Sequence, residues 1–266
     1  MASALRFYLT GRVAIEGTRT FDQASLPGRQ GRLALVYLVA ERDRPIPIEE
    51  LATALWGDRL PRTWEPSLRV VVSKLRAVLR DAGGPTATIA TASGCYDVHV
   101  GDAWVDIEAA ANAIDRAEGA WRHGDVATVW SDATVAAGIL RRPLLPGEDR
   151  PWVTGMRTRL REMAVRAMDL LVHVYLERRE HPLAIAVARE LVSLEPFREA
   201  SHRLLMRAHL AAGDRAEAVR THQALRDLLA EELGIDPSPA TTALYLAALR
   251  DGTPDPVRRV LERPTS

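Results

Sequence analysis

Cysteine, lysine and long apolar runs are scarce or missing in this sequence, and each absence excludes a class of site. Cys95 is the single cysteine among 266 residues, which excludes an internal disulfide and a metal site built from several cysteines. Lys74 is the single lysine among 35 basic residues. A phosphate-binding P-loop needs Gly-Lys followed by Ser or Thr, whereas Lys74 stands between Ser73 and Leu75. No run of eighteen uncharged apolar residues occurs, so we expect no membrane span.

An excess of charge of either sign is also missing. The chain has 35 basic and 35 acidic residues, and its first 100 residues carry 13 basic and 10 acidic ones. Contact with nucleic acid therefore requires a focused basic patch, because the whole chain supplies no positive field. The first ten residues lack a charged leader followed by a long apolar stretch, so we expect no secretory signal and a cytoplasmic protein.

Sequence patterns typical of enzymes are missing as well. Neither a Gly-x-Ser-x-Gly nor a Gly-x-Gly-x-x-Gly motif occurs. Among the seven histidines, His202 and His209 share a helical face, but no Glu-His pair or cysteine completes a metal site. We therefore expect structural histidines, no metal, no cofactor and no enzymatic activity.

The segment from Arg62 to Arg80 is the focused basic patch. It contains five basic residues and a single acid, Glu65. At helical spacing an apolar stripe faces a core, and its members are Leu68, Val72, Leu75 and Leu79. The opposite side presents groups that can contact phosphates and base edges, namely Arg69, Val70, Ser73, Lys74 and Arg76. The pattern predicts the recognition helix of a DNA-binding domain, over 67–80.

The flanking sequence predicts a winged helix-turn-helix around this segment. Alternating apolar residues indicate strands, Pro45-Ile46-Pro47 breaks the chain, and Gly83-Gly84-Pro85 ends the basic helix. The expected elements are strands near 5–9 and 13–15, helices over 29–40 and 48–56, the basic helix, and a hairpin over 89–100 that turns at Ser93-Gly94. We interpret Trp56 as a core anchor and Cys95 as an inert hairpin residue.

From Asp106 onward, strand signals give way to helices rich in alanine and leucine. Leu183–Ala186 and Ala216–Val219 begin similar helices at a spacing close to the ~34-residue tetratricopeptide period. The predicted fold class is mainly α with a small β component: an N-terminal winged helix-turn-helix followed by an all-α, tetratricopeptide-like domain. We expect domains over 1–101 and 102–251, with a disordered tail over 252–266.

Several short segments carry a resemblance in their order and spacing. In the first half they are Leu55-Trp56-Gly57-Asp58 and Ser67–Arg76. In the second half they are Asp106-Ile107, Glu195–Glu199, Ala211–Ala218 and Glu231–Pro239. Together they resemble the antibiotic regulatory protein (SARP) family of actinomycete transcription activators, from about Leu5 to Leu249.

The resemblance implies a winged-helix DNA-binding domain followed by a bacterial transcriptional activation domain. It further implies a homodimer on tandem promoter direct repeats, recruitment of RNA polymerase through its sigma and alpha subunits, and control of a secondary-metabolite gene cluster.

The resemblance also implies roles for single residues. Val70, Ser73 and Lys74 would face the major groove, with Ser67 and Arg76 holding phosphates or base edges. Arg62 and Arg80 flank the helix and are interpreted as backbone anchors. The full candidate DNA-binding set is Arg62, Ser67, Arg69, Val70, Ser73, Lys74, Arg76 and Arg80. Trp64, in the loop before the helix, is a candidate polymerase contact.

The hairpin departs from the family pattern, which usually includes an arginine and a Pro-Gly-Tyr turn. Here the segment reads Ala90-Thr91-Ala92-Ser93-Gly94-Cys95-Tyr96, and no basic residue lies between Asp81 and His99. Trp64 and Pro66 also replace small or polar residues. The uncharged wing leaves an alternative open: a protein–protein adaptor whose winged helix binds DNA weakly or not at all. Salt-dependent DNA affinity discriminates the two.

Overall fold

The computed structural model describes residues 5–250, so the predicted tail over 252–266 lies outside the described part of the chain. The contacts divide the chain into two compact units. The first runs to Asn112 and includes Gly138–Leu160; the second comprises Ala113–Ala137 and the described residues from Arg161 onward. Across 5–250, no helix is long and apolar enough to cross a membrane.

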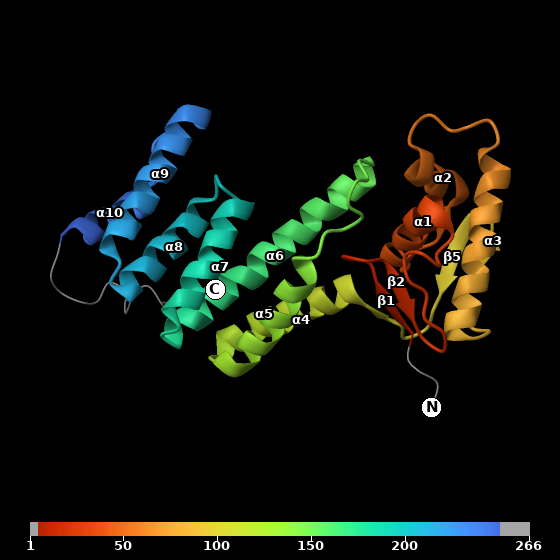
Figure 1. Ribbon diagram of the computed structural model, residues 1–266, viewed down its shortest axis with the longest axis horizontal. Coiled ribbons are helices and arrows are strands. Elements are labelled where there is room, and N and C mark those ends of the chain that lie inside the picture. Colours follow the sequence, from red (N-terminus) through yellow and green to blue (C-terminus); the bar gives the residue numbers. More distant parts are fainter. Residues whose placement is uncertain (1–4, 251–266) are drawn as a thin grey trace. The chain divides into compact units, whose positions relative to one another are not determined.

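The first unit contains the winged helix-turn-helix (Figure 1). Its helices are α1 (Gly28–Ala40), α2 (Ile48–Trp56) and α3 (Trp64–Gly83). Its strands are β1 (Arg6–Tyr8), β2 (Ala14–Glu16), β3 (Ile46–Pro47), β4 (Thr88–Ala92), β5 (Cys95–His99) and β6 (Trp104–Val105). The predicted order of small sheet, three helices and hairpin is confirmed.

The strands of this unit form two small sheets, with the strand orders β2-β1-β6 and β3-β5-β4. In the first sheet β1 pairs antiparallel with β2 and parallel with β6. In the second, the predicted hairpin gains β3 as a third strand, with Ile46 opposite Tyr96. The proline segment that we expected only to break the chain therefore also forms an edge strand, a position where proline is tolerated.

Helix α3 forms because its apolar residues follow the helical period, and a glycine ends it. The predicted stripe is confirmed: Leu68, Val72, Leu75 and Leu79 are each at most 1% exposed. Burying each such side chain contributes roughly 1.5–3 kcal/mol before entropy costs. The helix ends where Gly84 takes a φ of 79° and donates its backbone N–H to the carbonyl of Arg80. The helix begins three residues before the predicted range and ends three residues after it.

Polar contacts join other elements of the first unit to one another. The fully buried Asp106 carboxylate accepts hydrogen bonds from the backbone N–H groups of Leu9 and Thr10, both at 3.0 Å, and from the Thr10 hydroxyl at 2.8 Å. The Trp152 indole donates to the carbonyl of Ala54 at 2.9 Å. Trp56, which we interpreted as the core anchor, is only half-buried at the end of α2.

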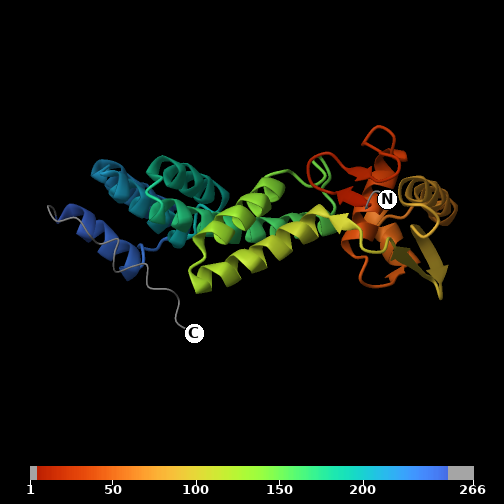
Figure 2. The ribbon, with the colours of Figure 1, turned by 90° about the horizontal axis from the view of Figure 1, so that it is seen from below.

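Up to residue 250, where the description ends, seven helices follow the wing: α4 (Asp106–His123), α5 (Val126–Leu140), α6 (Pro151–Glu177), α7 (His181–Leu194), α8 (Glu199–Ala212), α9 (Arg215–Leu233) and α10 (Pro239–Leu249). In the second unit α7, α8, α9 and α10 pack each against the next (Figure 2). Helices α7 and α9 begin 34 residues apart, as the predicted tetratricopeptide-like repeat requires.

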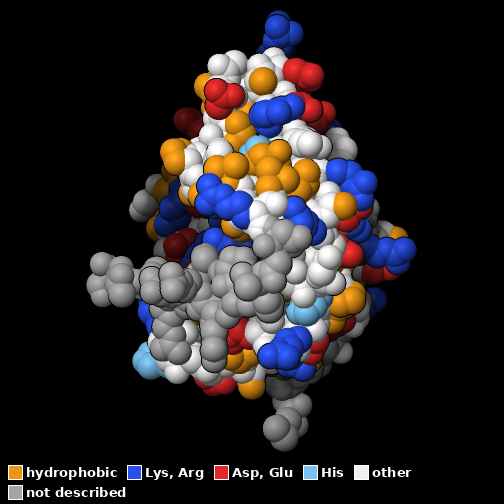
Figure 3. Space-filling model, turned by 90° about the vertical axis from the view of Figure 1, so that its left-hand side faces the viewer, with side chains coloured by type: hydrophobic (Ala, Val, Ile, Leu, Met, Phe, Trp, Pro, Cys, Tyr) orange, Lys and Arg blue, Asp and Glu red, His pale blue; other side chains and the backbone are white. Residues whose placement is uncertain are grey.

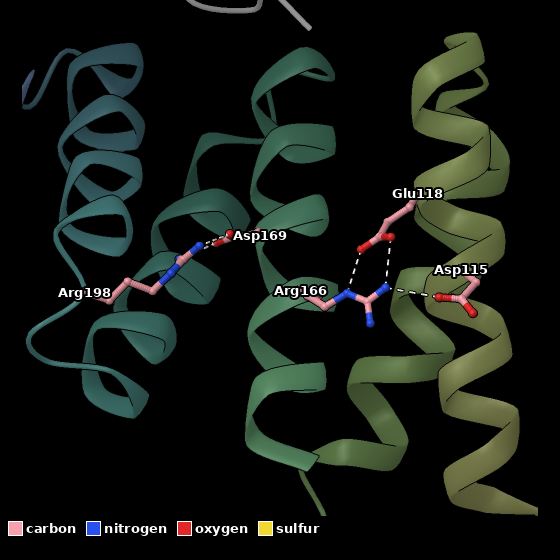
Figure 4. Close-up of polar contacts among 5 residues, drawn as sticks. All are labelled: Asp115, Glu118, Arg166, Asp169 and Arg198. Atoms are coloured by element: carbon pink, nitrogen blue, oxygen red, sulfur yellow. Dashed lines mark hydrogen bonds and ion pairs between the residues drawn. The ribbon is translucent and has the colours of Figure 1, made fainter. Parts of the chain in front are cut away.

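Bidentate arginines join the helices of the second unit (Figure 4). Arg166 of α6 donates to both Glu118 oxygens at 2.8 and 2.9 Å and to Asp115 at 3.1 Å, which ties α6 to α4. Arg198, just before α8, donates to both oxygens of Asp169 in α6. Such fork-to-carboxylate pairs fix orientation as well as distance.

Glu199, the first residue of α8, caps the start of α10. Its carboxylate accepts hydrogen bonds from the Ser238 N–H at 2.9 Å, the Ser238 hydroxyl at 2.7 Å and the Thr241 hydroxyl at 2.5 Å. Two of the segments that carry the family resemblance, 195–199 and 231–239, therefore meet in space. Both have a structural role in the helical unit.

The outer side of α10 is apolar. Within α10, the buried side chains are Thr241 and Ala248, whereas Leu246 and Leu249 are 40% and 41% exposed. Leu233 and Ile235, at the end of α9 and just after it, are 53% and 52% exposed. Figure 3 views the end of the unit that bears α9 and α10, and hydrophobic side chains gather there among arginines. Apolar surface of this kind is typical of protein–protein contact.

Candidate nucleic-acid interface

The exposed face of α3 carries most of the residues that the sequence proposed for DNA contact. Arg69, Val70, Ser73 and Lys74 are all exposed, and so are Arg62 in the preceding loop and Arg80 near the helix end. Ser67 is half-buried. The face is therefore basic and open along most of the helix, while its reverse is packed into the core.

The cations and the small residues occupy different parts of this face. At about 100° per residue, Val70, Ser73 and Ala77 fall near its centre. Lys74 falls toward one edge, and Arg69 and Arg80 fall toward the other. A face with short side chains at its centre and cations at its edges suits a helix that lies in the major groove. The centre can approach base edges while the long basic side chains reach the phosphates.

Arg76 is placed differently from the sequence expectation. We grouped it with the outward-facing residues, but it is half-buried against the hairpin, which runs beside α3 in Figures 1 and 2. Its Nε donates to the carbonyl of Ile89 at 2.6 Å and its Nη2 donates to the Thr91 hydroxyl at 2.6 Å. The guanidinium thus ties the first strand of the hairpin to the helix. No pattern in the sequence signals this pairing, because it depends on how the hairpin packs.

Arg69 has one weak partner on its own helix. Its guanidinium lies 3.4 Å from the carboxylate of Glu65, and the two side chains are 76% and 57% exposed. An ion pair this exposed contributes at most about 1 kcal/mol. Arg69 can therefore exchange Glu65 for a phosphate at little cost.

Trp64 lies half-buried at the start of α3 and lines a pocket of about 440 Å³. The other walls come from β3, the start of α2, the first turns of α3 and the hairpin turn, including Pro47, Arg69, Cys95 and Tyr96. Burial raises the pKa of Tyr96, which keeps the phenol neutral, although the charges of Arg76 and Arg69 oppose the shift. The candidate polymerase contact is thus partly covered, and Cys95 is half-buried beside it.

The two histidines considered as a metal pair serve the packing of α8. His202 and His209 are 4% and 2% exposed, and the His202 Nε2 lies 2.8 Å from the carbonyl of Pro196. Burial lowers the pKa of both. Across residues 5–250, no group of three or more His, Cys, Asp and Glu side chains is arranged to hold a metal ion.

Comparison with known proteins relates this chain to transcriptional regulators. The model of the bacterial transcriptional activator domain family matches residues 105–249. The regulatory protein AfsR of Streptomyces griseus is 30% identical over 250 residues, which span 94% of this chain and 25% of that protein. The transcriptional regulatory protein EmbR of Mycobacterium tuberculosis is 29% identical over 244 residues, spanning 87% of this chain and 61% of EmbR.

A solved structure of M. tuberculosis EmbR, in complex with a low affinity phosphopeptide, superimposes with a TM-score of 0.82. It is 26% identical and covers 95% of this chain and 66% of that one. The fold is a winged helix followed by a tetratricopeptide-like helical region, and the relatives named above are regulatory proteins. Because the family model matches more than half of the chain, the chain belongs to the bacterial transcriptional activator domain family, and the predicted resemblance to SARP-family proteins is confirmed. It spans about a quarter of the length of AfsR.

Proposed function

We propose that this activator is a sequence-specific DNA-binding protein that docks α3 in the major groove of promoter direct repeats. The observation that carries the proposal is the exposed face of α3, where Arg69, Lys74 and Arg80 flank small side chains. In this role Val70, Ser73 and Lys74 face the major groove, with Lys74 reaching a phosphate at its edge, and Arg62, Ser67, Arg69 and Arg80 hold the phosphate backbone. Arg76 acts from the hairpin side, through the wing that it holds.

The winged helix, over 1–101, supplies the DNA contact, and the helical part, over 102–251, supplies protein contacts. The apolar surface around Leu246 and Leu249 supports this division, because it offers a site for self-association or for a polymerase subunit. Recruitment of RNA polymerase through its sigma and alpha subunits, a homodimer on DNA and control of a secondary-metabolite gene cluster follow from the family resemblance. Trp64 is one further candidate for polymerase contact.

The adaptor alternative rests on the uncharged wing, whose turn at Ser93 and Gly94 offers a hydroxyl and backbone amides to a phosphate. A titration of duplex DNA at several salt concentrations separates the two functions. A DNA-binding activator loses affinity steeply with salt, and Lys74→Ala lowers the slope of log affinity against log salt by roughly one unit. Lys74→Arg keeps the charge and serves as the matched control. A slope of log affinity against log salt that is shallow and equal in the wild type, Lys74→Ala and Lys74→Arg would favour the adaptor.

A further inference from the structure

Val70 is the one large hydrophobic side chain that stands exposed in the described part of the first unit, at 53%. It lies in the middle of α3, a helix whose other large apolar residues are buried or, for Val71 and Trp64, half-buried. A β-branched residue on an exposed helical surface gains little from burial and is slightly unfavourable for the helix. The fold of the unit therefore gives no reason for valine at this position.

The neighbours of Val70 on the exposed face point to what it contacts. Ser73 lies one turn further along the helix and Ala77 two turns, so the centre of the face consists of small side chains beside Val70. Lys74 and Arg69 stand to either side. Their charges bring phosphates to the edges of the face and leave the centre, with Val70, against the floor of the groove.

The floor of the major groove offers one apolar group, the C5-methyl of thymine. The γ-methyls of Val70 can contact it, whereas valine has no hydrogen-bonding group for guanine, cytosine or adenine. We infer that Val70 reads a thymine methyl, so that each half-site contains one thymine that this side chain requires. The inference rests on the proposed function, since it concerns the same helix face.

The test replaces single thymines by deoxyuridine, which removes the methyl and leaves base pairing intact. The probe is the operator that the wild-type protein selects from random duplex DNA, and affinity is measured for each substituted duplex. We expect one thymine per half-site at which deoxyuridine weakens wild-type binding about fourfold, the value for one buried methyl-sized group. Other thymines serve as internal controls.

Two variants at position 70 connect the effect to the side chain. Val70→Thr keeps one γ-methyl and retains the sensitivity to deoxyuridine, whereas Val70→Ser removes both and binds the thymine and deoxyuridine duplexes equally. Val135→Ser, at a valine of α5 that is 50% exposed, leaves the sensitivity unchanged. Because all three substitutions lie on the exposed surface, thermal melting by circular dichroism should match that of the wild type.

The outcomes separate this inference from the proposed function. If an operator is selected but no thymine is sensitive, or if the sensitivity persists in Val70→Ser, the methyl contact is overturned and DNA recognition by α3 stands. Insensitivity to deoxyuridine is also the result expected if Val70 contacts a protein. If no operator is enriched by the folded protein, the proposed function and this inference fail together.

Discussion

At the scale of single residues, the basic side chains of α3 differ in what they already contact. Lys74 and Arg80 are exposed, and Arg69 has one weak partner. The Nε and Nη2 of Arg76, in contrast, both donate hydrogen bonds to the hairpin at 2.6 Å. An engaged guanidinium holds its neighbours in place, whereas an exposed cation can exchange water and counterions for a phosphate. Removing the two kinds of residue should therefore have different signatures.

Arg76→Ala should weaken specific binding roughly tenfold, the loss of about 1.4 kcal/mol from two hydrogen bonds that fix the hairpin. The slope of affinity against salt should stay unchanged, because no phosphate contact is lost. Arg76→Lys should behave like the alanine variant, since an ammonium cannot replace the planar fork. If Arg76→Ala instead lowers the slope by a unit and Arg76→Lys restores it, then Arg76 contacts phosphate directly.

At the scale of elements, the period of apolar residues carried most of the information. It predicted α2 and the buried stripe of α3, because burial of one face forces a regular spacing. The hairpin turn was predicted from the Ser93-Gly94 pair instead. Strands β3 and β6, of two residues each, show no alternation and were missed. The pairing of Arg76 with Ile89 and Thr91 was missed for a related reason. Contacts across 13 and 15 residues depend on packing geometry that no local pattern encodes.

Helix α10 should depend on its cap from another helix. Burial raises the pKa of Glu199, but hydrogen bonds from Thr241 and Ser238 outweigh it and lower the pKa overall, so the carboxylate is ionised and bonded near neutral pH. Glu199→Gln should lower the free energy of unfolding by about 1–2 kcal/mol in a urea titration followed by circular dichroism. Glu232→Gln, at an exposed acid of α9, is the matched control. Equal stability of the two variants would contradict the capping role.

At the scale of the whole molecule, the buried histidines are unevenly distributed between the two units. His173, His202, His209 and His222 all belong to the second unit, and burial lowers the pKa of each. The first unit contains a single histidine, the exposed His99. In the unfolded chain these histidines bind protons near pH 6.5, whereas in the folded helices they bind them only at lower pH. The free energy of unfolding is therefore highest above about pH 6.5, and it falls as the pH drops through the lowered pKa values of the folded state.

The second unit should consequently lose stability in mild acid. We expect the melting temperature of its transition to fall between pH 7.5 and pH 5.5, where few carboxylates titrate. His222→Phe keeps an aromatic ring against Tyr245, whose ring centroid lies 4.1 Å from that of His222, but cannot bind a proton. This variant should show a smaller fall than the wild type. An identical fall in both proteins would exclude His222 as a contributor.

The most direct test of the central claim, that α3 reads a DNA sequence, is selection of binding sites from random duplex DNA by the wild-type protein and by Lys74→Ala in parallel. We predict enrichment of a direct repeat that the wild type binds at least about a thousandfold more tightly than random duplex, and that Lys74→Ala binds more weakly. A folded wild-type protein that enriches no sequence would contradict DNA recognition by α3, and would turn attention to the partners of the helical unit.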